Sequence, residues 1–299
     1  MIPTDMVDFV RAAASAFDHG VGSHAAVDEL ALRNRPRRPA GPDRAQLYVC
    51  GRVVVKLQPA GTDPVLLHRR LQSITQPAAS RFWVQPLLNL PRRTPDGRLA
   101  TIWPRVEVLA PTDQPPWTQL GTLLAGLHQS LPTRPSAPQS SALDRLKRAV
   151  DYLQLRRDND LRWLAALGED LTDRLRRPQR TALIHGDFHL GQLGRPSADG
   201  IWSLLDPDDV GIGDPAWDLA RPAGLWAAGL LHDAAWMTLL AAYRHAGGPA
   251  VPPTGNPWPD LDLTARGATL IAAVQSLRSA QHPATTRALL EACRRMQNA

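Results

Sequence analysis

The chain has little lysine and little cysteine. Lys56 and Lys147 are its only lysines, so 32 of its 34 basic residues are arginine. Its two cysteines, Cys50 and Cys293, lie far apart, and the first residues lack the basic start and apolar core of a secretion signal. These absences argue against a disulfide framework. We expect two reduced thiols in a cytoplasmic protein.

Long apolar runs and aromatic residues are also scarce. No run approaches the roughly 18 residues that a membrane-spanning helix needs, so we expect no membrane partner. The net charge is +6 and aromatics make up 5% of the chain. A basic chain can bind nucleic acid, but here the arginines are scattered over amphipathic segments, with few rings among them for base stacking. We therefore expect solvated arginine faces and no nucleic-acid partner.

What is present suffices for a sizeable core. The 299 residues, 43% of them hydrophobic, allow one large domain or two modest ones. Residues 46–57 are rich in β-branched and apolar side chains and predict a hairpin turning near Gly51, or one long bent strand. In a chain that avoids lysine, Lys56 at the end of this segment stands out. It could reach the phosphates of a nucleotide, or simply extend from the strand end into solvent.

The next segments predict one helix and two strands. Asp63 is a good N-cap, Pro64 suits the first helical position, and an apolar stripe continues to residue 74. Strands are expected near 82–88 and 99–108, followed by a proline-rich break at 111–116. Amphipathic helices follow near 117–128, 143–153 and 161–175.

The densest group of functional side chains lies between residues 184 and 220. The chain reads IHGDFHLGQ from 184, LLD from 204 and GDPAWDLA from 213. Phosphoryl transfer from a nucleotide needs one acid to orient the attacking hydroxyl, and an amide and a second acid to hold Mg²⁺. Asp187 is the candidate for the first role. Gln192 and Asp206 are candidates for the second, since Mg²⁺ prefers oxygen ligands.

This order of motifs resembles the catalytic and metal-binding loops of the aminoglycoside phosphotransferase/choline kinase family of small-molecule kinases. The variant with His189 and Gln192 is similar to that of maltokinases and glucosamine kinases. The resemblance implies an α+β, two-lobed protein-kinase-like fold. A small β-rich N-lobe at residues 1–110, with an extra N-terminal helix, would bind the nucleotide. A larger helical C-lobe at residues 111–299 would carry catalysis and acceptor binding.

The resemblance also implies roles for single residues. Asp187 would be catalytic, with His185 bracing its loop, and Asp218 would support the loop backbone. Lys56 would bind the nucleotide phosphates. The helix at 63–74 lacks the glutamate with which the family pairs that lysine, so Gln72 is the candidate substitute.

Other candidates have weaker support. Gly41, in a basic turn, would cover the phosphates, although a turn at 19–23 is an alternative and either could be an ordinary surface turn. Backbone near Val106 and Leu109 would hold the base. His189 would contact the acceptor or brace the loop. Asp208 and Asp209 would contact the acceptor or lie in a solvated loop.

The reaction implied is transfer of the γ-phosphate of ATP or GTP, with Mg²⁺, to a hydroxyl of a sugar, amino sugar or aminoglycoside, by a monomer or homodimer. Four rings would stack on the acceptor or pack in the core: Trp226, Trp236, Tyr243 and Trp258. One alternative is a non-catalytic nucleotide- or nucleic-acid-binding relative, which the missing glutamate and the basic balance favour. Another is a metal-dependent hydrolase using His185, Asp187 and His189.

Overall fold

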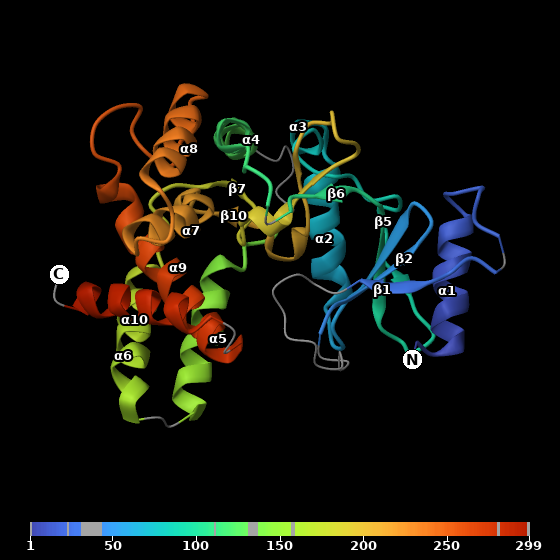
Figure 1. The fold of residues 1–299 in the computed structure, drawn as a ribbon, viewed down its shortest axis with the longest axis horizontal. Coiled ribbons are helices and arrows are strands. Elements are labelled where there is room, and N and C mark those ends of the chain that lie inside the picture. The colour runs from blue at the N-terminus through green and yellow to red at the C-terminus, as the bar shows by residue number, and fades with distance from the viewer. Residues whose placement is uncertain are drawn as a thin grey trace. The chain divides into compact units, whose positions relative to one another are not determined.

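The computed structural model describes residues 2–22, 24–30, 44–110, 112–130, 137–156, 159–279 and 282–297. The chain forms two compact units (Figure 1). Unit 1 comprises Met1–Pro111 and Gly191–Asp208, and unit 2 comprises Thr112–Leu190 and Asp209–Ala299. The sequence predicts one division of the chain, between residues 110 and 111, and does not predict that residues 191–208 belong to unit 1. The assignment of nucleotide binding to residues 1–110 and of acceptor binding to residues 111–299 stays a prediction. Gly41 lies outside the described residues.

The main sheet of unit 1 is antiparallel, with the strand order β1-β2-β3-β5-β4. The predicted hairpin is confirmed, because β2 and β3 pair from Gln46 with Leu57 to Cys50 with Val53. The bounds of the strands are β1 Asp28–Leu30, β2 Gln46–Cys50, β3 Val53–Leu57, β4 Arg92–Arg93 and β5 Leu99–Pro104.

Helix α1, Thr4–Ser15, covers one face of this sheet (Figure 1). Its buried residues Met6, Val10 and Ala14 recur every four positions and pack against β2, β3 and β5. On β3 the residues that join this core are Val53, Val55 and Leu57. Because side chains alternate along a strand, Lys56 points to the opposite face, the side on which α2 lies.

Helix α2, Pro64–Thr75, begins where the sequence predicts. Asp63 Oδ1 accepts hydrogen bonds from the backbone N–H of Val65 at 2.8 Å and of Leu66 at 3.2 Å. Proline follows at the first helical position, where its missing N–H has no cost. A short helix, α3 Pro77–Ser80, continues the chain.

The strand expected at 82–88 is wrong. Trp83 makes only an isolated bridge to Leu204. Pro86 cannot donate to a ladder, and the Gln85 amide bonds the carbonyl oxygens of Ile74, Ser80 and Trp83. These local bonds hold the segment as a loop.

A second sheet of unit 1 joins segments far apart in sequence. Its order is β6-β8-β9, with the bounds β6 Glu107–Val108, β8 Leu193–Arg195 and β9 Ser203–Leu204. The predicted strand at 99–108 is therefore two strands, β5 and β6. Gln192 directly precedes β8, and Asp206 follows β9 by two residues. The β8–β9 pairing thus brings Gln192 and Asp206 to the same end of one hairpin.

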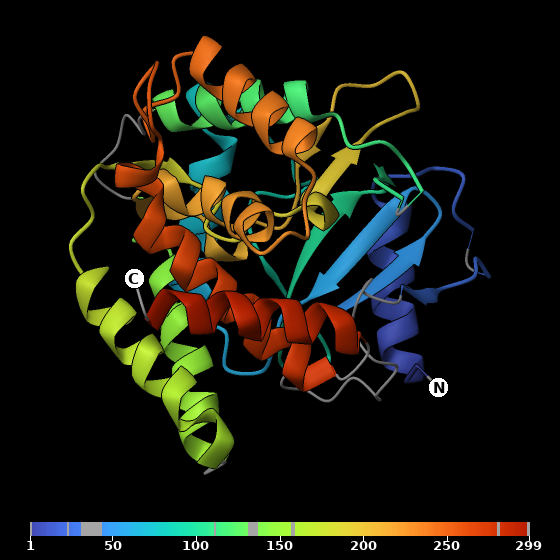
Figure 2. The ribbon, with the colours of Figure 1, turned by 60° about the vertical axis from the view of Figure 1, so that its left-hand side comes forward.

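Among the described residues of unit 2, the strands form one antiparallel pair, β10 with β7, and the remaining elements are helices. One core lies among α5, α6, α9 and α10, while α4 packs on α8 and α7 on α9 (Figure 2). None of the described helices combines the length and apolar character needed to cross a membrane. The bounds are α4 Trp117–Gln129, α5 Ala142–Arg156, α6 Arg162–Arg174, β7 Ala182–Ile184, β10 Gly211–Gly213, α7 Ala216–Ala227, α8 Asp233–His245, α9 Trp258–Ser279 and α10 Pro283–Gln297. The 3₁₀ turns are Asn159–Leu161, Leu190–Gln192 and Pro207–Asp209.

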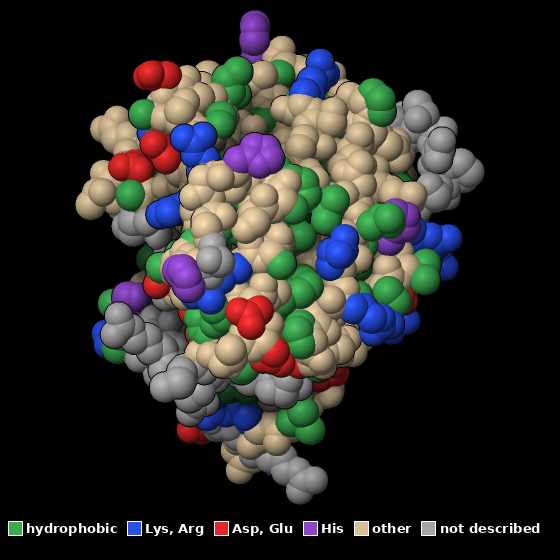
Figure 3. Space-filling model, turned by 90° about the vertical axis from the view of Figure 1, so that its right-hand side faces the viewer, with side chains coloured by type: hydrophobic (Ala, Val, Ile, Leu, Met, Phe, Trp, Pro, Cys, Tyr) green, Lys and Arg blue, Asp and Glu red, His purple; other side chains and the backbone are tan. Residues whose placement is uncertain are grey.

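The face of the molecule drawn in Figure 3 carries mixed charge. Its Lys and Arg side chains are scattered between acidic, apolar and histidine side chains rather than gathered into one field. Attraction of a polyanion requires a summed field of one sign, so this face gives no support to nucleic-acid binding.

The contact between α4 and α8 depends on Gly121. A Cβ there would lie 2.5 Å from the carbonyl oxygen of Leu239 and 2.7 Å from the backbone nitrogen of Tyr243. We predict that Gly121→Ala lowers the free energy of unfolding by up to about 2 kcal/mol, because overpacking costs about 1–3 kcal/mol and the helix gains about 1 kcal/mol. Thermal unfolding measures this. Gly22→Ala, where a Cβ meets nothing within 4 Å, is the control, and an equal melting temperature for both variants would contradict the packing argument.

Candidate active site

A loop in unit 2 presents Asp187. The buried strand β7 pairs with β10 and leads into His185 and Gly186. Gly186 has φ +81°, and a Cβ there would lie 2.5 Å from the carbonyl oxygen of Asp209 and 2.5 Å from Ser140 Oγ. The loop therefore needs glycine for both its backbone conformation and its space.

Asp218 on α7 binds the backbone of this loop. Its side chain is fully buried and accepts hydrogen bonds from the backbone N–H of His185 at 2.7 Å and of Gly186 at 2.8 Å. Burial alone would raise the pKa of Asp218, but the hydrogen bonds from the His128 side chain and from the backbone N–H of His185 lower it below its usual value. A carboxylate that accepts several N–H bonds is stabilised in its charged form.

His128 connects Asp218 to α8. His128 Nε2 lies 3.0 Å from Asp218 Oδ2, and Nδ1 lies 2.8 Å from the Tyr243 hydroxyl. The same hydroxyl accepts the backbone N–H of Ala250 at 3.0 Å, so its own proton is free to be donated. The arrangement that satisfies every group is a neutral His128 that donates from Nε2 and accepts at Nδ1.

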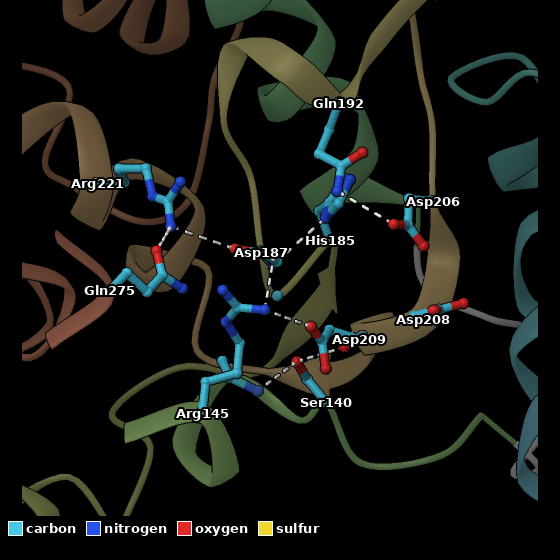
Figure 4. A network of polar contacts seen from close by, with 12 residues as sticks. Ser140, Arg145, His185, Asp187, Gln192, Asp206, Asp208, Asp209, Arg221 and Gln275 are labelled. Atoms are coloured by element: carbon cyan, nitrogen blue, oxygen red, sulfur yellow. Dashed lines mark hydrogen bonds and ion pairs between the residues drawn. The ribbon is translucent and has the colours of Figure 1, made fainter. Parts of the chain in front are cut away.

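Two arginines hold the Asp187 carboxylate (Figure 4). Arg145 Nη1 of α5 lies 2.7 Å from Oδ2, and Arg221 Nη2 of α7 lies 3.6 Å from Oδ1. Burial raises the pKa of Asp187 above its ordinary value, and the two arginines oppose this only in part. A buried carboxylate with a raised pKa beside opposite charges is typical of a proton-accepting group at a functional site.

Sequence reasoning missed Arg145 and Arg221. Arg221 follows Asp218 by three residues, so both lie on one face of α7. Because Asp218 was expected to support the Asp187 loop, this spacing could have indicated that Arg221 lies near the loop. Arg145 carried no such signal, because it is one of many arginines on amphipathic helices. Arg145 Nη1 also binds Asp209 Oδ2 at 2.9 Å. The Asp209 carboxylate is thus engaged in an ion pair and mostly buried, so the solvated-loop alternative is wrong, while its contact with an acceptor stays a prediction.

The histidines of the loop differ in burial. His185 is fully buried, and its Nδ1 accepts the backbone N–H of Asp187 at 3.3 Å. It therefore shapes the loop rather than facing outward. His189 is half-buried. In the described part of the chain, no group of three or more His, Cys, Asp and Glu side chains is placed to hold a metal ion.

Unit 1 holds a second charged group around Lys56. Its Nζ bonds Asp206 Oδ1 and lies 2.6 Å from Asp208 Oδ2. Burial alone would lower the pKa of Lys56, but these two carboxylates raise it above its usual value. The expected pairing of Lys56 with Gln72 is wrong, since Gln72 is exposed and the amine is satisfied by carboxylates. Asp208 likewise pairs with Lys56 rather than standing open to an acceptor.

Gln192 and Asp206 lie next to each other in unit 1. Gln192 Nε2 donates to Asp206 Oδ2 at 3.3 Å (Figure 4). Asp206 has φ +57°, alone among the described residues other than glycine, a conformation that Asp and Asn tolerate best. An amide and a carboxylate at one hairpin end are hard oxygen ligands, and Mg²⁺ in nucleotide sites commonly takes one or two protein ligands with phosphate oxygens and water. The residues present therefore fit Mg²⁺.

The remaining candidates are placed as follows. Val106 packs its side chain on Gly194, and Leu109 is buried; their role towards a base stays a prediction. Trp236 and Tyr243 are buried in the core, and Trp226, Trp236 and Trp258 stack on one another at centroid distances of 5.6–6.5 Å. These rings pack against protein rather than forming open platforms for a sugar.

The fold has solved relatives. A choline/ethanolamine kinase family protein from Mesorhizobium loti is 14% identical, with a TM-score of 0.61 over 98% of this chain and 95% of that one. Choline kinase LicA from Streptococcus pneumoniae is 14% identical, with a TM-score of 0.61 over 97% and 99%. The GDP complex of wild-type aminoglycoside 2′-phosphotransferase-IIIa is 16% identical, with a TM-score of 0.57 over 99% and 100%. The likeness confirms the predicted α+β protein-kinase-like fold.

Sequence comparison gives one further result. A family model described as "Phosphotransferase enzyme family" matches residues 43–258. No curated protein matches the chain. The matched range includes Lys56, the Asp187 loop, Gln192, Asp206 and Asp218.

Gly186→Ala tests the loop. We predict a loss of about 2–4 kcal/mol in the free energy of unfolding, because positive φ costs about 1–2 kcal/mol and the clash a similar amount. Gly255→Ala is the matched control, since Gly255 has φ +84° but nothing within 4 Å of a Cβ. Denaturant unfolding of both variants separates the two costs. Equal losses would show that the close approach to Ser140 and Asp209 is not tight.

Proposed function

Because the chain belongs to the phosphotransferase enzyme family, we propose that it transfers the γ-phosphate of a nucleoside triphosphate to a hydroxyl group of a small molecule. The observation that carries this proposal is the Asp187 carboxylate, whose side chain is only 17% exposed. It stands on a loop whose backbone is bonded to Asp218 and lies between two guanidinium groups. A carboxylate fixed in this way can orient a hydroxyl as it attacks phosphorus.

Asp187 acts on the acceptor in the proposed reaction. Its carboxylate accepts a hydrogen bond from the acceptor hydroxyl and points the oxygen at the γ-phosphorus. As the new P–O bond forms, the bond from the γ-phosphorus to the β–γ bridging oxygen breaks, the nucleoside diphosphate leaves, and Asp187 takes up the hydroxyl proton. The raised pKa makes the carboxylate a better proton acceptor than an exposed aspartate. His185 keeps Asp187 in place through the bond to its backbone N–H.

Lys56, Gln192 and Asp206 act on the nucleotide. Lys56, held charged by its carboxylate partners, would bind phosphate oxygens. Gln192 and Asp206 would hold Mg²⁺, which when bound neutralises charge on the β- and γ-phosphates. The GDP complex among the solved relatives supports use of a nucleotide, and ATP and GTP both fit the proposal.

Sugars remain our proposed acceptors among those that the loop variant suggested. The guanidinium groups beside Asp187 offer N–H donors, which a protonated amine cannot accept, so a neutral sugar suits this site better than a cationic amino sugar or aminoglycoside. A non-catalytic relative is less well supported, since Asp187, Gln192 and Asp206 are all present and held by specific contacts.

The first test is nucleotide turnover across an acceptor panel. We predict ADP or GDP release that depends on Mg²⁺ and on acceptor, and that falls at least about 10²-fold in Asp187→Asn, within the range typical of a lost general base. Nucleotide binding should survive this change. Wild-type turnover in Asp187→Asn would show that the carboxylate has no part in the transfer.

Asp206→Asn tests the metal ligand while keeping a side chain that tolerates positive φ. We predict that Mg²⁺-dependent nucleotide affinity falls at least about tenfold, the scale of a 1.4 kcal/mol loss. Asp199→Asn, an exposed aspartate on the β8–β9 connection, is the control. Titration calorimetry with and without Mg²⁺ measures both. Equal affinity in Asp206→Asn and wild type would remove Asp206 from the metal site.

The pH dependence of turnover tests the state of Asp187. Activity requires the ionised carboxylate, so kcat/KM should fall as the pH drops through the pKa of Asp187, which lies above the ordinary value of about 3.9. Arg221 lowers this pKa. Arg221→Gln should therefore move the acid limb to higher pH, whereas Arg174→Gln, which removes an exposed partner of Asp170, should not. An acid limb that stays in place in Arg221→Gln would exclude Asp187 as its origin.

A further inference from the structure

We propose that the acceptor carries an anionic group, a carboxylate or a phosphate, and that Arg145 and Arg221 bind it. This inference rests on the proposed function, because it names the chemical class of the acceptor that Asp187 would meet. It begins from a small cavity beside the Asp187 carboxylate, here called the arginine pocket. Arg145, Asp187, Phe188, Trp217, Arg221 and Ile271 line the arginine pocket.

The two arginines enter the arginine pocket with unused donors. Arg145 contacts Asp187 and Asp209 through Nη1 alone. Arg221 contacts Asp187 and Gln275 through Nη2 alone. Across the described residues, the other two nitrogens of each guanidinium make no hydrogen bond, and none of them is among the buried groups without a partner. Four N–H-bearing nitrogens therefore remain open to a ligand.

Guanidinium donors in this number match an anion. Guanidinium N–H groups bind carboxylate or phosphate oxygens in strong, charge-assisted hydrogen bonds, and a cation cannot accept from them. The side chains of Arg145 and Arg221 are only 17% and 23% exposed. Apolar neighbours, Trp217 and Ile271, lower the local dielectric and strengthen the attraction.

The size of the arginine pocket suits the end of a molecule. Its volume of about 20 Å³ holds roughly one water-sized group. An oxygen of a carboxylate or phosphate fits, while a sugar ring does not. The acceptor would thus insert its charged end beside Asp187, and the ion pairs would fix the distance from that end to the hydroxyl that reacts.

The acceptor, rather than the nucleotide, is the source of this anion. Every residue that lines the arginine pocket belongs to unit 2. The side chains suited to nucleotide phosphates, Lys56, Gln192 and Asp206, belong to unit 1. Asp187, which contributes to the arginine pocket, is the group assigned to the acceptor hydroxyl.

Calorimetric binding to the full chain tests the proposal with four matched probes: glucose, glucosamine, gluconate and glucose 6-phosphate. Each is titrated with and without Mg²⁺ and a non-hydrolysable ATP analogue. We expect gluconate or glucose 6-phosphate to bind at least tenfold more tightly than glucose, and glucosamine more weakly. Which of the two binds more tightly identifies the anion as a carboxylate or a phosphate.

Arg221 variants identify the group responsible. Arg221→Gln should weaken binding of the acidic probe by a larger factor than binding of glucose, and Arg221→Lys should restore part of this preference. Arg174 is exposed and pairs with Asp170, so Arg174→Gln should change neither the binding of the acidic probe nor the binding of glucose. If Arg221→Gln instead weakens the ATP analogue by the same factor, the arginines serve the nucleotide and the proposal is overturned.

The outcomes separate this proposal from the proposed function. Equal affinity for acidic and neutral probes overturns the anionic acceptor, while phosphorylation of glucose would still uphold the kinase. Failure to bind any nucleotide would overturn the kinase, and the titrations without nucleotide would still decide whether the arginine pocket binds an anion.

Discussion

The buried carboxylate of Asp218 holds together the parts of unit 2 that matter for chemistry. It accepts two backbone N–H groups of the loop that carries Asp187, and its second contact, His128, ties it to Tyr243 on α8. A charge with no exposed surface is stable only when such bonds surround it. Removing any partner would leave a buried polar group unsatisfied, and for that reason the loop has little freedom to change shape.

Each unit contains one group of paired charges, and the two groups differ in their balance of cations and carboxylates. In unit 1 a single lysine faces two carboxylates, Asp206 and Asp208. In unit 2 two arginines face two carboxylates, Asp187 and Asp209. The neighbouring residues Asp208 and Asp209 thus pair with different cations. The first group has the composition expected for phosphates with Mg²⁺, and the second is the group that we propose binds an anionic acceptor.

Much of the architecture could be predicted from the sequence, because it depends on local patterns. The hairpin ending at Lys56 and the cap at Asp63 follow from β-branched runs and N-cap chemistry. The order of Asp187, Gln192 and Asp206 pointed to the right family. The cap at Asp63 and the hairpin that contains Lys56 could be predicted without knowing any contact to a distant part of the chain.

The errors have physical causes of another kind. The segment at 82–88 looked like a strand, but Gln85 and Pro86 favour local bonds. Gln72 was assigned to Lys56 because the family places an acid on that helix, whereas the partners come from a loop about 150 residues away. Arg145 and Arg221 approach Asp187 from helices that only the folded chain brings near it. Arg145 left no signal in the sequence, and for Arg221 the signal was its spacing from Asp218 on α7.

Phosphoryl transfer can be followed directly by ³¹P NMR of the γ-phosphorus, with wild type and Asp187→Asn, in the presence and absence of acceptor. We predict a new phosphomonoester signal that grows in step with nucleoside diphosphate, requires the acceptor and is lost in Asp187→Asn. Inorganic phosphate as the sole product, formed at the same rate with or without acceptor and in both proteins, would contradict this prediction.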